Sequence, residues 1–210
     1  MLNCRCIPVG MLQSNSYLLK DEATGALALV DCGVFNKQVR EAVAAAGGDL
    51  RYILLTHGHF DHTQGIQAAK EAYPGMQVGI AEEDAPFLRG ETSTFPGRTI
   101  GRGKLAEPDF LLHDDDAIEL GESQLQVIAT PGHSPGGVCF FSEADDLLFT
   151  GDTLFCEEVG RADLVGSDWQ TLQASIRLLY TLKGNPAVLP GHGPASRLNH
   201  ERKHNPYVKM

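Results

Sequence analysis

Histidine and aspartate gather in one short stretch of this 210-residue chain, in the order His-Gly-His-Phe-Asp-His from His57 to His62. The apolar run Tyr52–Leu55 precedes the stretch and predicts a strand, and a helical pattern follows it. Imidazole and carboxylate groups are donors that suit zinc, iron or manganese. A single histidine here would be typical of a turn, and a single aspartate of a helix N-cap. The full H-x-H-x-D-H spacing instead indicates a metal site.

Three more candidate ligands come directly after predicted strands, and each lies beside a glycine. They are His133 after Leu125–Ala129, Asp152 after Leu147–Thr150, and His192 after Ala187–Leu189. Glycine lets the backbone turn sharply at a strand end, so that the side chain reaches inward. Because strand ends meet at the rims of sheets, we expect these ligands to join the first group.

The candidate ligands are too many for one tetrahedral ion and sufficient for two ions if one carboxylate bridges them. They are His57, His59, Asp61, His62, His133, Asp152 and His192. Two metals about 3.5 Å apart share a water and lower its pKa from about 15.7 towards neutrality, which yields a bridging hydroxide at pH 7. The sequence therefore predicts a two-metal hydrolytic centre.

Short apolar runs and helical patterns predict the elements that position these residues. Further strands are expected at Leu2–Val9, Tyr17–Lys20, Ala26–Asp31, Gln77–Ile80 and Val138–Phe141, and helices at Asn36–Ala46, Thr63–Tyr73 and Asp168–Leu182. This order predicts two sheets stacked face to face with helices outside, in one domain over residues 1–210. The stretch 89–110 is rich in glycine, proline and basic residues without periodicity, and is expected to be a substrate loop.

Composition narrows the class of protein. Lys+Arg 17 against Asp+Glu 27 gives a net charge of −10, which disfavours nucleic acid as a partner. The chain lacks an apolar run long enough to span a membrane and a recognisable signal peptide. Five scattered cysteines are typical of reduced thiols, so we expect a cytoplasmic protein. The oligomeric state stays open.

The motif set resembles that of the metallo-β-lactamase-fold hydrolases across about residues 2 to 207. His57 to His62 match the family's H-x-H-x-D-H motif, and Val30-Asp31-Cys32-Gly33 resembles its upstream D-x-G. The resemblance implies an αββα fold and two divalent metals, zinc foremost with iron or manganese as alternatives. It implies one metal on His57, His59 and His133. It implies a second on Asp61, His62 and His192, with Asp152 bridging. Asp31 would hold a ligand histidine in place.

Within that family the chain is similar to short glyoxalase II-like proteins (hydroxyacylglutathione hydrolases). Gly160-Arg161-Ala-Asp163 and Pro190-Gly-His192-Gly-Pro194 carry this similarity. The chain ends at Met210, whereas full-length glyoxalase II carries a helical domain that binds glutathione. The resemblance therefore implies the fold and the metal chemistry more firmly than a glutathione carrier.

The expected reaction is hydrolysis of a small acyl thioester such as S-D-lactoylglutathione, with Asp61 and Asp152 as catalytic carboxylates and Arg161 binding the substrate. A thiolate leaves without a general acid, and no such acid is evident beside the ligands. A mononuclear iron persulfide dioxygenase using His57, His133 and Asp152 is the main alternative. Lactone, β-lactam or phosphodiester hydrolysis and a non-catalytic metal-binding scaffold also stay open.

Overall fold

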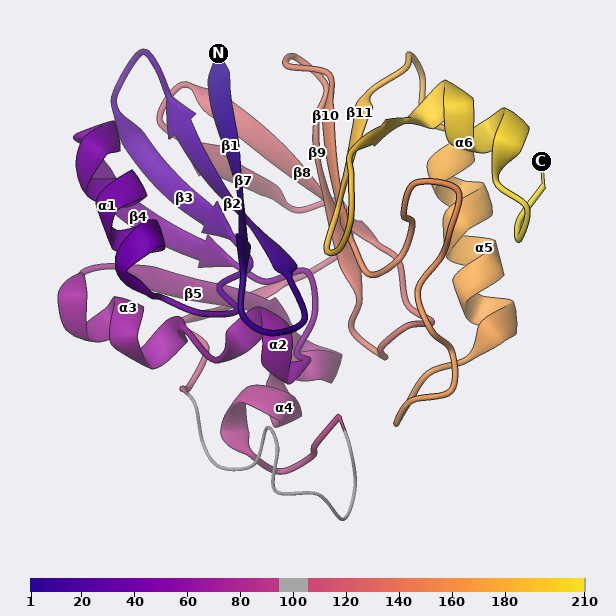
Figure 1. Ribbon diagram of the computed structural model, residues 1–210, viewed down its shortest axis with the longest axis horizontal. Helices are drawn as coiled ribbons and strands as arrows, with labels where there is room; N and C mark the ends of the chain where they lie inside the picture. Colours follow the sequence, from indigo (N-terminus) through magenta and orange to yellow (C-terminus); the bar gives the residue numbers. More distant parts are fainter. Residues whose placement is uncertain (95–105, 210) are drawn as a thin grey trace.

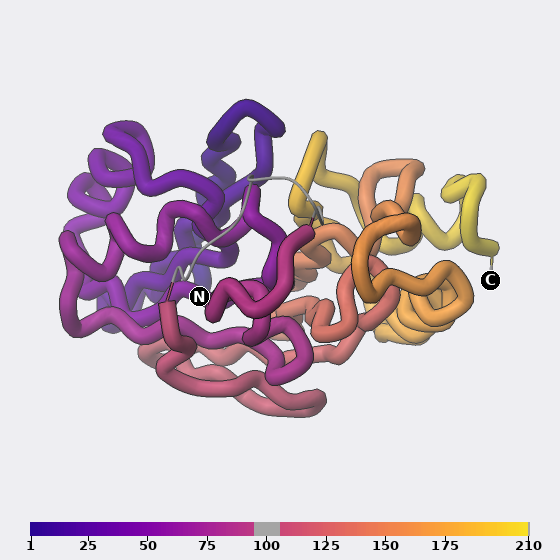
Figure 2. Tube along the Cα trace, turned by 90° about the horizontal axis from the view of Figure 1, so that it is seen from below, coloured from indigo at the N-terminus to yellow at the C-terminus, as the bar shows by residue number. Residues whose placement is uncertain are grey.

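Two six-stranded β-sheets stack face to face in the computed structural model, which describes residues 1–94 and 106–209, and helices cover their outer faces (Figure 1). The first half of the chain forms one sheet and its helices, and the second half forms the other (Figure 2). The two stacked mixed sheets with outer helices expected from the sequence are confirmed.

The first sheet has the strand order β1-β2-β3-β4-β5-β6, antiparallel from β1 to β3 and parallel from β3 to β6. Its strands are β1 (Leu2–Val9), β2 (Ser14–Asp21), β3 (Ala26–Val30), β4 (Asp49–Leu54), β5 (Gln77–Ala81) and β6 (Phe110–Leu112). Because β3, β4 and β5 run in the same direction, their carboxyl ends lie at one edge of this sheet.

The second sheet has the order β12-β11-β10-β9-β8-β7, in which β10 and β11 are parallel and the other pairs antiparallel. Its strands are β7 (Ala117–Leu120), β8 (Ser123–Ala129), β9 (Val138–Ser142), β10 (Leu147–Gly151), β11 (Ala187–Pro190) and β12 (Ser196–Arg197). The helices are α1 (Lys37–Ala46), α2 (Phe60–Thr63), α3 (Ile66–Ala72), the 3₁₀ helix η1 (Glu82–Asp84), α4 (Ala85–Arg89), α5 (Trp169–Tyr180) and α6 (Leu198–His204).

Alternation along the strands divides the apolar residues into three layers. In β3, Leu27 and Leu29 face α1 and α3, whereas Ala28 and Val30 face the second sheet. Phe140 of β9 packs in this middle layer, and α5 covers the other face of the second sheet. A strand buried on both faces accounts for the continuous apolar run that predicted it.

The strands predicted around the candidate ligands are confirmed to within a few residues, and the structure differs at other places. The predicted helix Thr63–Tyr73 corresponds to α3, which begins only at Ile66. Thr63 is the last residue of the separate short helix α2, and Gly65 lies between the two helices. A Cβ on Gly65 would lie 2.5 Å from the Cys32 sulfur, so the chain packs too closely there for a side chain. Strands β6, β7 and β12 and helices α2, η1, α4 and α6 have no counterpart among the predicted elements.

The predicted substrate loop 89–110 is bounded by structure on both sides. Arg89 is the last residue of α4, Phe110 begins β6, and residues 95–105 lie outside the described part of the chain. The loop's role stays a prediction. No helix among the described residues is long and apolar enough to cross a membrane.

Asp21 joins the two sheets at the end of β2. One of its carboxylate oxygens accepts hydrogen bonds from the backbone of Ala23 and Thr24, and the other accepts from Glu122 N and Ser123 Oγ. Removal from water raises the pKa of Asp21, but these hydrogen bonds outweigh that effect and lower it to about 2. The ionised carboxylate therefore stabilises the folded protein.

We expect Asp21→Asn to lower the midpoint of thermal unfolding at pH 7, because an amide cannot accept on both sides. Unfolded aspartate titrates near pH ~3.9, so the stabilisation is complete above about that pH and is lost as the pH falls towards 2. The difference in midpoint between wild type and variant should narrow over that interval. Asp49→Asn, at an exposed side chain, is the control; equal midpoints for wild type and Asp21→Asn at pH 7 would contradict the assignment.

Candidate metal centre

The predicted ligands meet at the edge where β4, β8, β10 and β11 end. Thr56 and His57 follow β4, and the short helix α2 carries Asp61 and His62. His133, Asp152 and His192 follow the other three strands. The structure thus brings together all seven side chains that the sequence selected.

The first group of donors consists of His57, His59 and His133, whose ligand atoms lie within 4.8 Å of one another. His59 Nδ1 is 2.9 Å from His133 Nε2. The imidazole ring centroids are 4.6 to 4.9 Å apart, and all three rings are buried. Three ring nitrogens converging in a dry environment can hold one divalent cation.

The second group consists of Asp61, His62 and His192, again with ligand atoms within 4.8 Å. His192 Nε2 lies 3.2 Å from Asp61 Oδ2 and 3.3 Å from His62 Nε2. His62 is fully buried, whereas the His192 side chain is 27% exposed. This group therefore borders the solvent-accessible side of the centre.

Asp152 lies between the two groups. Its Oδ1 is 3.5 Å from His62 Nε2. Its Oδ2 is 3.4 Å from His133 Nε2 and 3.6 Å from His192 Nε2. One carboxylate thus faces donors of both groups, which is the position of a bridging ligand.

For three of the imidazoles, a hydrogen bond to the outer nitrogen decides which nitrogen faces the centre. Carbonyl oxygens can only accept, so Nδ1 of His133 donates to Arg161 O at 2.8 Å, and Nδ1 of His192 donates to Leu12 O at 3.1 Å. His62 Nδ1 likewise donates to Asp31 Oδ2 at 2.8 Å. In each ring Nε2 then keeps its lone pair for a cation, and the partner fixes the ring's orientation.

Asp31, which directly follows β3, supports both groups. Besides His62, its carboxylate accepts from Thr56 N and Thr56 Oγ1, each at 2.8 Å. Because the Thr56 hydroxyl donates to Asp31, it accepts from His57 Nδ1 at 3.0 Å. Asp31 also lies within 4.8 Å of ring nitrogens of His57 and His62, but these three hydrogen bonds already occupy its oxygens. It therefore holds the imidazoles rather than a metal.

The electrostatics of the centre fit cations. Burial lowers the pKa of His57 well below its usual range and that of His59 to about 2, so both rings stay neutral donors. Burial also lowers the pKa of His62, but Asp152, Asp31 and Asp61 outweigh it and raise it to about 10. Its surroundings therefore attract a positive charge. The buried atoms His57 Nε2 and Asp152 Oδ1 have no hydrogen-bond partner, and a bound ion would satisfy both.

A cavity of about 280 Å³ opens over the centre. Besides the candidate ligands it is lined by Leu12, Phe60, Thr94, Phe155, Arg161 and Leu164. The Arg161 guanidinium, 62% exposed, forms two hydrogen bonds with Asp163 at 2.8 and 2.9 Å. The sequence selected Arg161 for its side chain. Its carbonyl, which orients His133, left no signal in the residue type.

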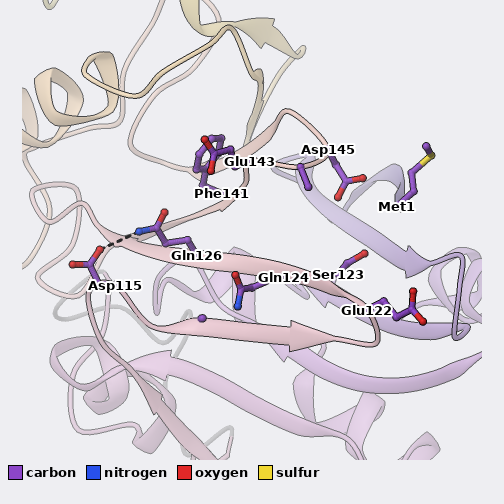
Figure 3. A pocket seen from close by; sticks show the side chains of 11 residues that line it. Met1, Asp115, Glu122, Ser123, Gln124, Gln126, Phe141, Glu143 and Asp145 are labelled. Carbon is purple, nitrogen blue, oxygen red and sulfur yellow. Dashed lines mark hydrogen bonds between the residues drawn. The ribbon is translucent and has the colours of Figure 1, made fainter.

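A larger hollow of about 610 Å³ lies on β7, β8 and β9 and contains none of the seven candidate ligands (Figure 3). Its lining includes Asp115, Glu122, Glu143 and Asp145, and Asp115 accepts a hydrogen bond from Gln126 at 3.0 Å. The hollow lacks the converging imidazoles of the metal centre.

Comparison with known proteins places this geometry in a family. The model of the metallo-beta-lactamase superfamily matches residues 9–192. A Bacillus subtilis (strain 168) protein named probable metallo-hydrolase YqgX is 32% identical and aligns over 97% of this chain and 96% of its own. The hydroxyacylglutathione hydrolase GloC of Haemophilus influenzae is 28% identical over 99% of this chain and 98% of its own.

Solved structures agree. The B3 metallo-beta-lactamase BLEG-1 has a TM-score of 0.90 at 30% identity and covers 100% of both chains. TTHA1623, determined in a di-iron-bound form, has a TM-score of 0.86 at 33% identity over 97% of this chain and 100% of its own. ETHE1 from Myxococcus xanthus has a TM-score of 0.80 at 26% identity over 98% and 84%.

We expect Asp31→Asn to weaken metal binding about 10- to 100-fold, the usual effect of removing a ligand's hydrogen-bond partner. Asn tolerates the left-handed backbone at this position, where φ is 58°, but its amide cannot accept all three hydrogen bonds. Titration against a competing chelator measures the change, with Asp168→Asn at the N-cap of α5 as control. Unchanged affinity would show that Asp31 does not support the ligands.

Proposed function

Because this chain belongs to the metallo-beta-lactamase superfamily, we propose that it is a hydrolase that uses two divalent metal ions to cleave small acyl thioesters. The observation that carries the proposal is the pair of donor groups with Asp152 between them. His57, His59 and His133 would hold one ion, and the second group the other.

Bound divalent ions would supply Lewis acidity towards the substrate carbonyl and would acidify a water. Nitrogen and carboxylate donors suit zinc, which we propose, and also iron or manganese. Asp31, Asp61 and Asp152 place three negative charges around the imidazole of His62. Two divalent ions would neutralise these charges, which supports a two-ion centre.

Asp61 and Asp152 border the cavity and act on the attacking water. Burial raises the pKa of Asp61, but the hydrogen bond and charge of His192 and the charge of His62 lower it to about 2. The carboxylate is therefore ionised at neutral pH, and it orients the water as a hydrogen-bond acceptor rather than storing a proton. Asp152 faces both donor groups and keeps their separation fixed.

The leaving group must depart without help from a protein acid. Among the described residues that line the cavity there is no lysine, tyrosine, glutamate or cysteine, and its one arginine is paired with Asp163. A thiol with a pKa near ~8.5 leaves as a thiolate, whereas an alcohol or amine needs a proton. This supports a thioester, as does the similarity to the hydroxyacylglutathione hydrolase GloC.

The cavity walls support a substrate with an apolar part and one acidic part. Leu12, Phe155 and Leu164 offer apolar surface beside the donors. Arg161 lines the cavity and would bind a substrate carboxylate in exchange for Asp163. We therefore propose a small-molecule acyl thioester as partner and place S-D-lactoylglutathione first among the compounds to assay.

A second candidate is an iron-dependent dioxygenase acting on persulfides. His57, His133 and Asp152 supply two imidazoles and a carboxylate, the ligand set of non-haem iron oxygenases. The presence of a complete second donor group favours the two-metal hydrolase.

Metal content and thioester hydrolysis, measured on the same preparation, test the proposal. We expect about two metals per chain and hydrolysis of S-D-lactoylglutathione that a chelator abolishes and metal restores. Asp152→Ala should lose activity by at least about 10²-fold together with part of the metal, because it removes the group that faces both sites. Asp145→Ala, on the distant acidic hollow, is the matched control.

One iron per chain, no thioester cleavage, and oxygen uptake with glutathione persulfide would overturn the hydrolase in favour of the dioxygenase. Two metals without either activity would refute the thioester and retain the metal centre.

Arg161→Ala should raise KM for S-D-lactoylglutathione up to about fivefold, the value of an exposed ion pair, and leave kcat and metal content unchanged. The alanine keeps the carbonyl that orients His133. Asp163→Asn should lower the same KM, since it frees the guanidinium. A neutral acyl thioester should respond to neither change, and an equal response to both substrates would contradict a carboxylate contact.

A further inference from the structure

A buried carboxylate outside the donor groups lies between two of the ligand loops. Asp84 is the last residue of η1 and is 0% exposed. It occupies the N-cap position of α4, where an aspartate usually accepts from its own helix, yet its side chain makes no capping bond. Both of its oxygens are used elsewhere.

Each oxygen accepts a hydrogen bond from a different loop. Asp84 Oδ2 accepts from Gly58 N at 2.7 Å, and Gly58 lies between His57 and His59. Asp84 Oδ1 accepts from Gly136 N at 2.7 Å, three residues after His133. One loop follows β4 of the first sheet and the other follows β8 of the second, so Asp84 connects the two sheets through the first donor group.

The packing leaves this connection little freedom. A Cβ on Gly136 would lie 2.7 Å from Asp84 N. A Cβ on Gly58 would lie 2.9 Å from Asp84 O and 2.7 Å from the Cβ of Phe87. Both loops therefore contact the Asp84 segment with bare backbone, and any side chain there would push them away from it.

An ionised group is unfavourable in such a place. Burial raises the pKa of the Asp84 carboxyl, and the Ser134 hydroxyl, the two loop amides and the nearby His133 only partly offset the effect. A neutral, isosteric asparagine would avoid that penalty but would direct its NH₂ group at one of the two amide donors. A carboxylate is the side chain of this size that accepts from both loops.

We propose that Asp84 is a positioning residue that sets the spacing between the His57–His59 loop and the His133 loop, and so tunes the metal affinity of the first donor group. The inference rests on the proposed function only in that this group holds a metal. It does not depend on the substrate.

The test compares Asp84→Asn with Asp21→Asn in the metal-loaded full chain. Asp21 is a matched control, because it is also a buried carboxylate that joins the two sheets by accepting on both oxygens, but at the end of β2 away from the metal centre. Zinc affinity is measured against a competing chelator, and the cobalt-substituted proteins are compared by their visible absorption spectra. Thermal unfolding of the metal-free proteins is recorded alongside.

We expect Asp84→Asn to weaken one of the two metal sites about tenfold or more, at the lower end of the range for groups that orient ligands, and to shift the cobalt spectrum. Asp21→Asn should lower the unfolding midpoint and leave both metal affinities and the spectrum as in wild type. Wild-type affinities in Asp84→Asn, or an equal loss in both variants, would overturn the proposal.

Amide hydrogen exchange in the wild-type protein keeps the inference testable should Asp84→Asn not fold. Gly58 and Gly136 should be protected to a similar extent, and rapid exchange at either amide would overturn the connection. Wild-type chains that bind two metals without cleaving thioesters would refute the proposed substrate alone. If the wild-type protein hydrolyses thioesters but Asp84→Asn has wild-type metal affinities and cobalt spectrum, this inference alone is refuted.

Discussion

The hydrogen bonds of the Asp31 carboxylate are the interaction on which the rest of the centre depends. Asp31 accepts directly from His62 of the second donor group. It also accepts from Thr56, whose hydroxyl in turn accepts from His57 of the first donor group. To make these hydrogen bonds, Asp31 adopts a left-handed backbone with φ of 58°, a conformation that most residues avoid. A strained residue at the end of a buried strand therefore orients imidazoles of both groups at once.

Strand direction explains why this network can form. β3, β4 and β5 are parallel, and β10 is parallel to β11, so the residues that follow them leave at the same edge of each sheet. The second sheet stacks on the first through a layer that includes Val30 and Phe140. The ligand loops of the two sheets thus come into contact, where Thr56 O accepts from Val138 N at 2.8 Å and Asp84 joins Gly58 to Gly136.

The sequence was most informative where residue type and burial coincide. β3 is apolar and buried throughout, and β4 is apolar from Tyr52 to Leu54, so the positions of both strands could be predicted. The seven candidate ligands could be selected because their side chains are types that bind metals. The polar, charge-rich segment of α6, Leu-Asn-His-Glu-Arg-Lys-His, lacks an apolar period, and it was therefore missed. Strands β6 and β12 are too short for alternation to distinguish.

Other parts of the centre left no signal in the residue types. The carbonyls of Arg161 and Leu12 orient His133 and His192, and every residue type carries a carbonyl. Asp84 follows Glu82 and Glu83, so that in the sequence it is indistinguishable from a solvated acidic run. Glu82 and Glu83 are exposed, whereas η1 packs against two loops and buries the carboxylate of Asp84. Only this packing distinguishes Asp84 from the two glutamates.

The backbone and the side chain of Arg161 have different roles, and this difference bears on how the substrate of such a site can change. Arg161 lines the cavity, its carbonyl orients a candidate metal ligand, and its guanidinium pairs with Asp163. The same holds for Leu12, which lines the cavity and whose carbonyl orients His192. Substitution at these positions alters the surface offered to a substrate and retains the hydrogen bonds that hold the imidazoles. The cavity walls can therefore vary without loss of the metal centre, which is why the fold and the donor groups constrain the chemistry more tightly than they constrain the substrate.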